Sequence, residues 1–329
     1  MLLCRLLLLG MLRRFIPQPL KPLARIALKF FHAIRWAFFH PYYVIATSRP
    51  VWFHLMNREG RANFRRNPAP LDGIQERIVS DLKAEGITIT HLDDLFPGRR
   101  LLPELEFHAR QALAAARVGR KKTFLRYAWL NSGDTILLDL ADPLIRLAIE
   151  PRALETINAY MALWSKLDFY SLAATLPVPD GSAEQGSQRW HRDPGDKRIC
   201  KMFLYLTDVT NNGAGPFYYV RASHEGGRWR GVYPPRPDDG YYPPSGDIER
   251  IIPHADIMTC LGRAGTIILA DTTGFHRGGY TTAQDRIMFT AAYSAKWSIT
   301  HPIKYRYPAR FDEALLPLLP IQRYAVDNR

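Results

Sequence analysis

The feature that most constrains the fold is a series of short apolar runs in the second half of the chain. From about residue 166 onward, runs rich in β-branched and aromatic residues follow one another, each bounded by Gly, Pro, Asn or Asp. The runs are LDFYSLAATLP, RICKMFLYLTDV, GPFYYVRAS, AGTIILAD and RIMFTAAYSAKW. Short strands at this spacing, with no helical pattern between them, are typical of antiparallel sandwiches and jelly rolls. We therefore expect a jelly-roll core over residues 166–300.

Helical patterning precedes these strands. In IQERIVSDLKAEGITI the apolar residues recur on one helical face, and Gly86 is placed to end the helix. Helix is also expected in PELEFHARQALAAARVG and in DPLIRLAIEPRALETINAYMALW, the latter broken at Pro151. The sequence therefore predicts an α+β domain over residues 71–329, in which helices of residues 71–165 support the jelly roll.

The cysteines and the overall composition indicate a globular protein of a reducing compartment. The apolar fraction is 47% and the charged fraction 23%, as in ordinary globular proteins. The three cysteines (Cys4, Cys200 and Cys260) are odd in number, far apart and form no Cys-x-x-Cys, which excludes a disulfide framework and a thiolate metal cage. We expect a cytoplasmic protein.

The net charge of +13 is concentrated at the N-terminus. Residues 1–70 hold twelve Lys and Arg against the single acid Glu59, which leaves 32 basic and 30 acidic residues for the rest of the chain. The body of the protein is close to neutral and contains no evident base-stacking motif, so we expect no nucleic-acid partner. Residues 1–70 form a basic N-terminal extension.

Within this extension, PLARIALKFFHAIRWAFFHPYY has the pattern of an amphipathic helix with a basic face and a Phe-rich face. Lys29 and Arg35 interrupt it too often for a membrane-spanning helix. It suits a peripheral contact of residues 20–40 with an anionic membrane surface. Two alternatives stay open: the helix packs on the catalytic domain, or it belongs to an organelle transit peptide.

Three His-x-Asp pairs offer candidate metal ligands, and about one would arise by chance. They are His91 and Asp93, His191 and Asp193, and His254 and Asp256. The first lies in a short link where a turn is the ordinary explanation. The third precedes the next candidate histidine by only about twenty residues, too few for the strands of a jelly roll, and a strand-edge or loop role is its default.

The pair His191 and Asp193 lies at the start of a predicted strand, in which alternate side chains point to the same face. His276 follows Asp193 by 83 residues, at the end of another apolar run, and offers a third ligand. Two imidazoles and one carboxylate on one side of an ion leave open positions for substrate and O₂ at non-haem Fe(II).

Arg286 lies ten residues after His276. A hairpin centred near Thr281 would make His276 and Arg286 cross-strand partners. The guanidinium would then point into the metal pocket, where it can pair with a carboxylate of an iron-bound co-substrate. Lys201 and Tyr205, on one face of an earlier strand, are further candidates to line the co-substrate pocket.

Three stretches together resemble the phytanoyl-CoA dioxygenase family of Fe(II)- and 2-oxoglutarate-dependent oxygenases. They are WHRDPGDKR, LTDVTNNGAGPFYYVRASH and AGTIILADTTGFHRGGYTTAQDR, and the likeness covers roughly residues 72–297. It implies a double-stranded β-helix, of the cupin-like jelly-roll kind. It further implies that His191, Asp193 and His276 are the iron ligands and that Arg286 binds the 5-carboxylate of 2-oxoglutarate.

The chemistry implied by this resemblance is hydroxylation of a C–H bond of a small-molecule or lipid-like substrate, coupled to conversion of 2-oxoglutarate and O₂ to succinate and CO₂. Asp193 favours hydroxylation, since related halogenases have Ala or Gly at that position. Two positions depart from common patterns: Met288 stands where many relatives carry Ser or Tyr, and Tyr280 where Asn is frequent.

A Pro-, Gly- and Tyr-rich insertion over residues 221–258 is placed to act as a lid. Arg192, Arg198 and Trp229 are candidate substrate contacts, although ordinary packing explains such residues more often, and His224 is expected to be structural. Alternative functions are a catalytically inactive jelly-roll binding module at a membrane surface, an oxidative demethylase of nucleic acid, and an oxygenase that does not use 2-oxoglutarate. The sequence carries no signal for oligomeric state.

Overall fold

The computed structural model describes residues 37, 40–42, 44–46, 48–118, 127–130, 136–234, 242–297, 305–306 and 317–327. The chain divides into two compact units, Met1–Ser48 and Arg49–Arg329. The amphipathic helix and membrane contact predicted for residues 20–40 lie almost entirely outside the described residues. Among the residues that are described, no helix is long and apolar enough to cross a membrane.

The second unit is built on two antiparallel sheets. A six-stranded sheet has the order β1-β8-β5-β10-β4-β2, and a three-stranded sheet has the order β7-β6-β9. The bounds are β1 Ile87–His91, β2 Tyr127–Leu130, β4 Lys166–Thr175, β5 Cys200–Tyr205, β6 Phe217–Val220, β7 Ile257–Cys260, β8 Thr266–Asp271, β9 His276–Gly278 and β10 Arg286–Ser294. Short strands β3 (Ile136–Leu137) and β11 (Tyr305–Arg306) pair in parallel. The predicted antiparallel architecture is confirmed.

Two strands of the larger sheet come from the region expected to be helical support. β1 pairs with β8, from Ile87 opposite Ala270 to His91 opposite Thr266. β2 pairs with β4, from Tyr127 opposite Thr175 to Leu130 opposite Leu172. Both are edge strands of five residues or fewer. Runs this short have no clear periodicity of their own, and the neighbouring strand decides their conformation.

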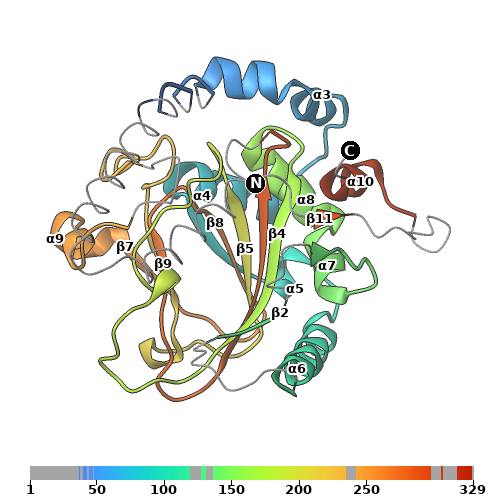
Figure 1. Cartoon of the computed structure of the whole chain (residues 1–329). Helices are drawn as coiled ribbons and strands as arrows, with labels where there is room; N and C mark the ends of the chain where they lie inside the picture. Colours follow the sequence, from blue (N-terminus) through green and yellow to red (C-terminus); the bar gives the residue numbers. More distant parts are fainter. Residues whose placement is uncertain are drawn as a thin grey trace, which may run out of the picture. The chain divides into compact units, whose positions relative to one another are not determined.

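Helices cover one face of the larger sheet. They include α4 Gly73–Glu85, α5 Leu92–Leu95, α6 Leu102–Val118, α7 Pro143–Ala148, α8 Pro151–Met161 and α10 Pro320–Val326. In Figure 1, α6, α7 and α8 lie on one side of the long strands β4 and β5, and β7, β9 and α9 (Asp247–Ile251) lie on the other. The break predicted at Pro151 is confirmed, because α7 ends at Ala148 and α8 begins at the proline.

The start and end of α4 follow from local chemistry. Asp72 accepts hydrogen bonds from the backbone N–H groups of Ile74 and Gln75, and the Gln75 side chain accepts one from Asp72 N, which completes a capping box. Gly86 ends the helix with φ 76°, and a Cβ there would lie 2.4 Å from Tyr219 Oη. Only glycine fits both the backbone angle and the close approach. The helix end predicted at Gly86 is confirmed.

Strand β5 separates two apolar cores. Its residues Cys200, Met202 and Leu204 are buried with the helices, whereas Phe203 and Tyr205 belong to a second cluster together with residues of the three-stranded sheet, such as Phe217. Side chains that alternate along a strand point to opposite faces. Lys201 therefore shares the face of β5 that looks toward the smaller sheet.

The second unit begins with residues that the charge pattern assigns to the basic extension. η2 (Pro50–Met56) and α3 (Arg58–Arg66) precede the jelly roll. Trp52 is 2% exposed within the main core, and its indole N–H donates to Asp196 Oδ1 at 2.5 Å. Residues 49–66 are thus a packed part of this unit.

Candidate metal centre

Backbone hydrogen bonds bring the two predicted ligand segments together. His191 N donates to His276 O at 3.1 Å, and His276 N donates to His191 O at 3.0 Å. Asp193 N donates to the backbone oxygen of Thr272 at 2.8 Å. Residues 191–193 therefore lie beside the turn and the first residue of β9, although the sequence separates them by some eighty positions.

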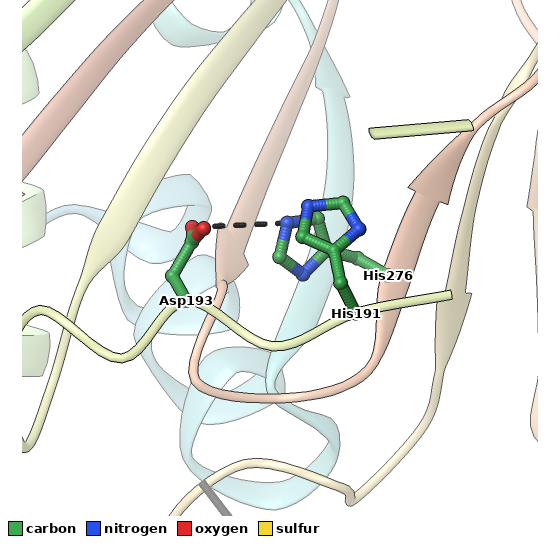
Figure 2. A group of neighbouring side chains, drawn as sticks. All are labelled: His191, Asp193 and His276. Atoms are coloured by element: carbon green, nitrogen blue, oxygen red, sulfur yellow. Dashed lines mark ion pairs between the residues drawn. The ribbon is translucent and has the colours of Figure 1, made fainter. Parts of the chain in front are cut away.

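The three predicted ligands converge at one point (Figure 2). Their ligand atoms all lie within 4.8 Å of one another, and His276 Nε2 is 3.7 Å from Asp193 Oδ2. His191 Nδ1 lies 2.8 Å from Arg189 O, and His276 Nδ1 lies 3.0 Å from Gly274 O. When Nδ1 donates to a backbone carbonyl, Nε2 keeps its lone pair for a metal. Both histidines are oriented in this way by the carbonyl two residues earlier.

The protonation states favour a cation. Burial lowers the pKa of His276 to about 3 and also lowers the pKa of His191, so both imidazoles are neutral at pH 7. Burial by itself would raise the pKa of Asp193, but the Lys201 ammonium, 2.6 Å from Oδ2, stabilises the carboxylate and holds this pKa well below its usual range. Two neutral nitrogens and one carboxylate oxygen are the donor set that suits a divalent transition metal such as Fe(II). The residues thus fit the ion that the resemblance implies.

The other two His-x-Asp pairs have structural roles, and His191, Asp193 and His276 form the only metal-competent group among the described residues. His91 caps α5 by accepting from Asp93 N, and its Nε2 lies 3.0 Å from Ala264 O. Asp256 accepts a hydrogen bond from Trp229 Nε1 at 3.0 Å and pairs with Arg228. The turn expected at the first pair is not observed, because His91 ends β1 and Asp93 lies in α5, and His254–Asp256 form the short 3₁₀ helix η5 before β7.

The predicted pairing of His276 with Arg286 is wrong. β9 pairs with β6, where His276 lies opposite Tyr219, and β10 pairs with β4, where Arg286 lies opposite Thr175. The segment between them crosses from the smaller sheet to the larger one. A turn-like sequence does not show whether the two strands it joins pair within one sheet or belong to the two facing sheets of the jelly roll.

Arg286 nevertheless lies near the strand that carries His276. It is 3% exposed and donates through Nη2 to Thr175 Oγ1 at 3.0 Å and through Nη1 to Gly215 O. A Cβ built on Gly278 would lie 3.6 Å from Arg286 Nη2. Gly278 is two residues after His276 on the same strand, hence on the same face. The guanidinium is therefore directed at the ligand-bearing face of β9.

Lys201 and Tyr205 occupy different environments on β5. Lys201 Nζ lies 2.6 Å from Asp193 Oδ2, next to the candidate centre. The Tyr205 hydroxyl donates to Cys260 O at 3.0 Å and accepts from Phe217 N at 2.8 Å. That hydroxyl is already engaged by two backbone groups, so these contacts give no support to a co-substrate role for Tyr205. His224 is 2% exposed with Nε2 3.3 Å from Lys83 O, as expected of a structural histidine.

The sequence did not reveal the roles of two residues near the centre, Arg192 and Tyr242. Arg192, a candidate substrate contact, is 1% exposed and donates to four backbone carbonyls. Its place between His191 and Asp193 on an extended segment was the signal that it must point away from the metal. Tyr242 stacks on His191, with ring centroids 5.4 Å apart, and no sequence pattern singles it out among the tyrosines of the insertion.

A third residue, Asp271, organises the turn between β8 and β9. It is fully buried, and it accepts hydrogen bonds from Tyr160 Oη at 2.5 Å and from Thr273 N at 3.0 Å. This turn supplies the carbonyls of Thr272 and Gly274 that orient Asp193 and His276. A buried carboxylate with such partners fixes the geometry of the ligands that depend on it.

Two solved structures share this arrangement of strands. The chain is similar to the epimerase SnoN, solved with Fe³⁺, alpha-ketoglutarate and nogalamycin RO, with a TM-score of 0.51 and 17% identity, over 75% of this chain and 90% of SnoN. It is also similar to the alpha-ketoglutarate-dependent carbocyclase SnoK, with a TM-score of 0.51 and 13% identity, over 77% of this chain and 94% of SnoK.

The chain thus has the double-stranded β-helix fold. The fold expected from the resemblance to the phytanoyl-CoA dioxygenase family is confirmed by these matches. No protein-family model matches the sequence, and no curated protein matches it either.

Proposed function

We propose that this protein is an Fe(II)- and 2-oxoglutarate-dependent oxygenase that acts on a small-molecule or lipid-like substrate. The observation that carries the proposal is the convergence of His191, Asp193 and His276 within 4.8 Å, on segments of a double-stranded β-helix. An inactive binding module with this fold has no need of two neutral imidazoles and an ionised carboxylate at one point.

Fe(II) held by these three residues would supply the activation of O₂ and the oxidative decarboxylation of 2-oxoglutarate to succinate and CO₂. The protein's own part is placement. The carbonyls of Arg189 and Gly274 hold the imidazoles in one tautomer and one orientation, so the ligands are preorganised.

Arg286 is proposed to bind the distal carboxylate of 2-oxoglutarate. Its buried guanidinium faces the ligand-bearing side of β9, and Thr175 and Gly215 hold it in place. A planar guanidinium fixed in this way forms paired hydrogen bonds with a carboxylate. Lys201, beside Asp193, is a second cation available to a co-substrate at this site.

For the reaction type, we propose hydroxylation of a C–H bond. Asp193 keeps the full set of three protein ligands, which supports this assignment. SnoN and SnoK are named as an epimerase and a carbocyclase, so proteins with this fold also carry out reactions that are not hydroxylations. Their substrates and outcomes are their own, and the product must be measured for this chain.

The deciding experiment adds Fe(II) and 2-oxoglutarate to the purified protein without O₂. A weak visible charge-transfer band should appear for the wild-type chain and be absent for His276→Ala. His254→Ala is the matched control, because that histidine lies outside the proposed centre, and its band should equal that of wild type. A normal band in His276→Ala would refute the ligand assignment.

The substrate and reaction type require a second experiment. Candidate small molecules and lipids are screened for stimulated succinate release, and the product is weighed by mass spectrometry under ¹⁸O₂. Hydroxylation predicts one added oxygen derived from O₂, whereas epimerisation leaves the mass unchanged. A product of unchanged mass would refute hydroxylation while leaving the metal site intact.

A further inference from the structure

The residues that alternate with the metal ligands face away from the centre, toward the insertion of residues 221–258. These residues are Trp190, Arg192, Phe275 and Arg277. We propose that the described parts of this insertion, residues 221–234 and 242–258, form a backing layer that positions the two ligand segments, with Glu249 as the positioning residue that joins them. The proposal deepens the proposed function, because it rests on the same three ligands.

Glu249 on α9 contacts both ligand segments through one oxygen. Trp190 Nε1 donates to Glu249 Oε1 at 2.7 Å, and Arg277 Nη2 lies 3.9 Å from the same atom. Trp190 immediately precedes His191, and Arg277 immediately follows His276. The Arg277 guanidinium also lies over the Trp190 ring, 5.0 Å from its centroid. One carboxylate of the insertion therefore lies against the immediate neighbours of two proposed ligands, and Glu184, outside the insertion, pairs more closely with Arg277.

An apolar cluster fixes α9 in place beneath this contact. Ile248 and Ile252, respectively 0% and 2% exposed, share a buried cluster with Trp190 and Phe275. Phe275 immediately precedes His276. The helix is thus anchored on the back of both histidine-bearing segments.

Arg192 connects a second part of the insertion to the ligands. Its Nη2 donates to Trp229 O at 3.1 Å and to Val232 O at 3.0 Å, and its Nη1 donates to Thr273 O at 2.6 Å. The guanidinium lies 3.8 Å from the Phe275 ring centroid. Four hydrogen bonds to buried carbonyls hold this position rigidly, because leaving any of these groups unpaired is costly. One guanidinium therefore joins the insertion, the turn before β9 and the segment of His191 and Asp193.

The consequence is a coupling between the insertion and the preorganisation of the metal site. Outer residues that orient metal ligands typically change metal affinity 10- to 100-fold when they are removed. Glu249 contacts the residues next to the proposed ligands and not the ligands themselves, so its effect should be smaller. We expect its removal to weaken metal binding about threefold to tenfold, without unfolding the jelly roll.

Hydrogen–deuterium exchange on the metal-free chain tests the coupling directly. In Glu249→Ala, exchange at residues 190–193 and 275–278 should rise roughly threefold to tenfold, the effect of losing one ordinary, partly exposed hydrogen bond. Glu249→Gln keeps an oxygen for Trp190 Nε1 and should recover most of the protection. Arg250→Ala is the matched control on the same helix, since Arg250 is paired with Asp247 and its side chain is 69% exposed.

Exchange in β4 distinguishes positioning from general destabilisation. Exchange there should equal that of wild type in all three variants. Wild-type exchange of residues 190–193 in Glu249→Ala would overturn the proposal, as would an equal rise in β4 or an equal effect of Arg250→Ala.

Titration with Co(II), followed by its visible absorption, then measures the effect on affinity. The dissociation constant should rise about threefold to tenfold in Glu249→Ala and stay unchanged in Arg250→Ala. An unchanged constant in Glu249→Ala would overturn the coupling to metal. If the wild-type chain binds no Co(II) at all, the proposed function fails, and the exchange experiment on the metal-free chain still decides whether the insertion positions the ligand segments.

Discussion

Removing the Trp52 side chain should destabilise the loop that follows the second ligand. Trp52 donates from its indole N–H to Asp196 Oδ1, and Asp196 closes the segment HRDPGD three residues after Asp193. Asp196 also accepts from Lys197 N at 2.7 Å and from Ala295 N at 3.0 Å. Trp52 is therefore both a core residue and a support of the loop that follows the proposed ligand Asp193.

The magnitude follows from burial and from the lost donor. Trp52 is 2% exposed, and replacement of such a residue by Ala typically costs about 3–5 kcal/mol. Trp52→Phe keeps most of the ring and removes the N–H, so it should cost about 1–3 kcal/mol. Trp297→Phe is the control, because that side chain is 57% exposed and should change stability by less than about 0.5 kcal/mol.

The cost of Trp52→Phe should depend on pH. Burial raises the pKa of Asp196 to about 7, while the indole N–H opposes this rise by stabilising the carboxylate. A carboxyl whose folded pKa lies above its unfolded value of about 3.9 loses stability as pH rises from about 4 to 7. Without the indole donor the folded pKa rises further and this loss continues above pH 7, so Trp52→Phe should be more destabilising at pH 8 than at pH 6.

Urea unfolding followed by far-ultraviolet circular dichroism measures these free energies. Two truncations extend the test: removal of residues 1–48 keeps Trp52, whereas removal of residues 1–56 deletes it. The longer truncation should lose at least about 3–5 kcal/mol relative to the shorter one, a large part of the 5–15 kcal/mol typical of a domain. Equal stability of the two truncations, or of Trp52→Phe and wild type at both pH values, would refute the reasoning.

Four further predictions concern the site and the N-terminus. Arg286→Lys should raise the 2-oxoglutarate concentration needed for half-maximal succinate release by roughly tenfold or more, since a point charge replaces a bidentate fork; unchanged dependence would contradict its role. Tyr242→Ala, which uncovers His191, should increase 2-oxoglutarate turnover in the absence of substrate relative to Tyr242→Phe, measured as succinate released. The metal-free chain should lose stability as pH falls from about 6.5 toward 3. The buried imidazole of His276 has its pKa lowered to about 3, so it takes up a proton on unfolding in this pH range. Chemical denaturation of His276→Gln should therefore show a smaller pH dependence of stability. Deleting residues 1–48 should abolish sedimentation with anionic vesicles if the predicted membrane contact of residues 20–40 exists, and unchanged sedimentation would exclude it.

Much of the fold was predictable because its signals are local. The runs that became β4, β5, β6, β8 and β10 are rich in β-branched and aromatic residues, and the helix end at Gly86 and the break at Pro151 follow from backbone chemistry. β1 and β2 were not foreseen, because their four or five residues adopt the strand conformation only where β8 and β4 pair with them.

The sequence predicts which residues belong to the site, but it does not predict how their strands pair. The spacing of His191, Asp193 and His276 suffices to propose three ligands, and the structure brings them within 4.8 Å. The pairing of His276 with Arg286 failed, because the sequence suggests a turn but does not show that the chain changes sheets within it.

The sequence by itself determined which residue types stand at alternate positions: the proposed ligands at 191, 193 and 276, and large or charged side chains at 190, 192, 275 and 277. Backbone alternation makes that pattern meaningful before any fold is known. Only the tertiary structure decided what lies behind the ligands, because the contacts of Arg192 with Val232 and of Trp190 with Glu249 join positions 40 and 59 residues apart. Such contacts depend on how the insertion packs against the strands, and the conformational preferences of neighbouring residues do not determine that packing.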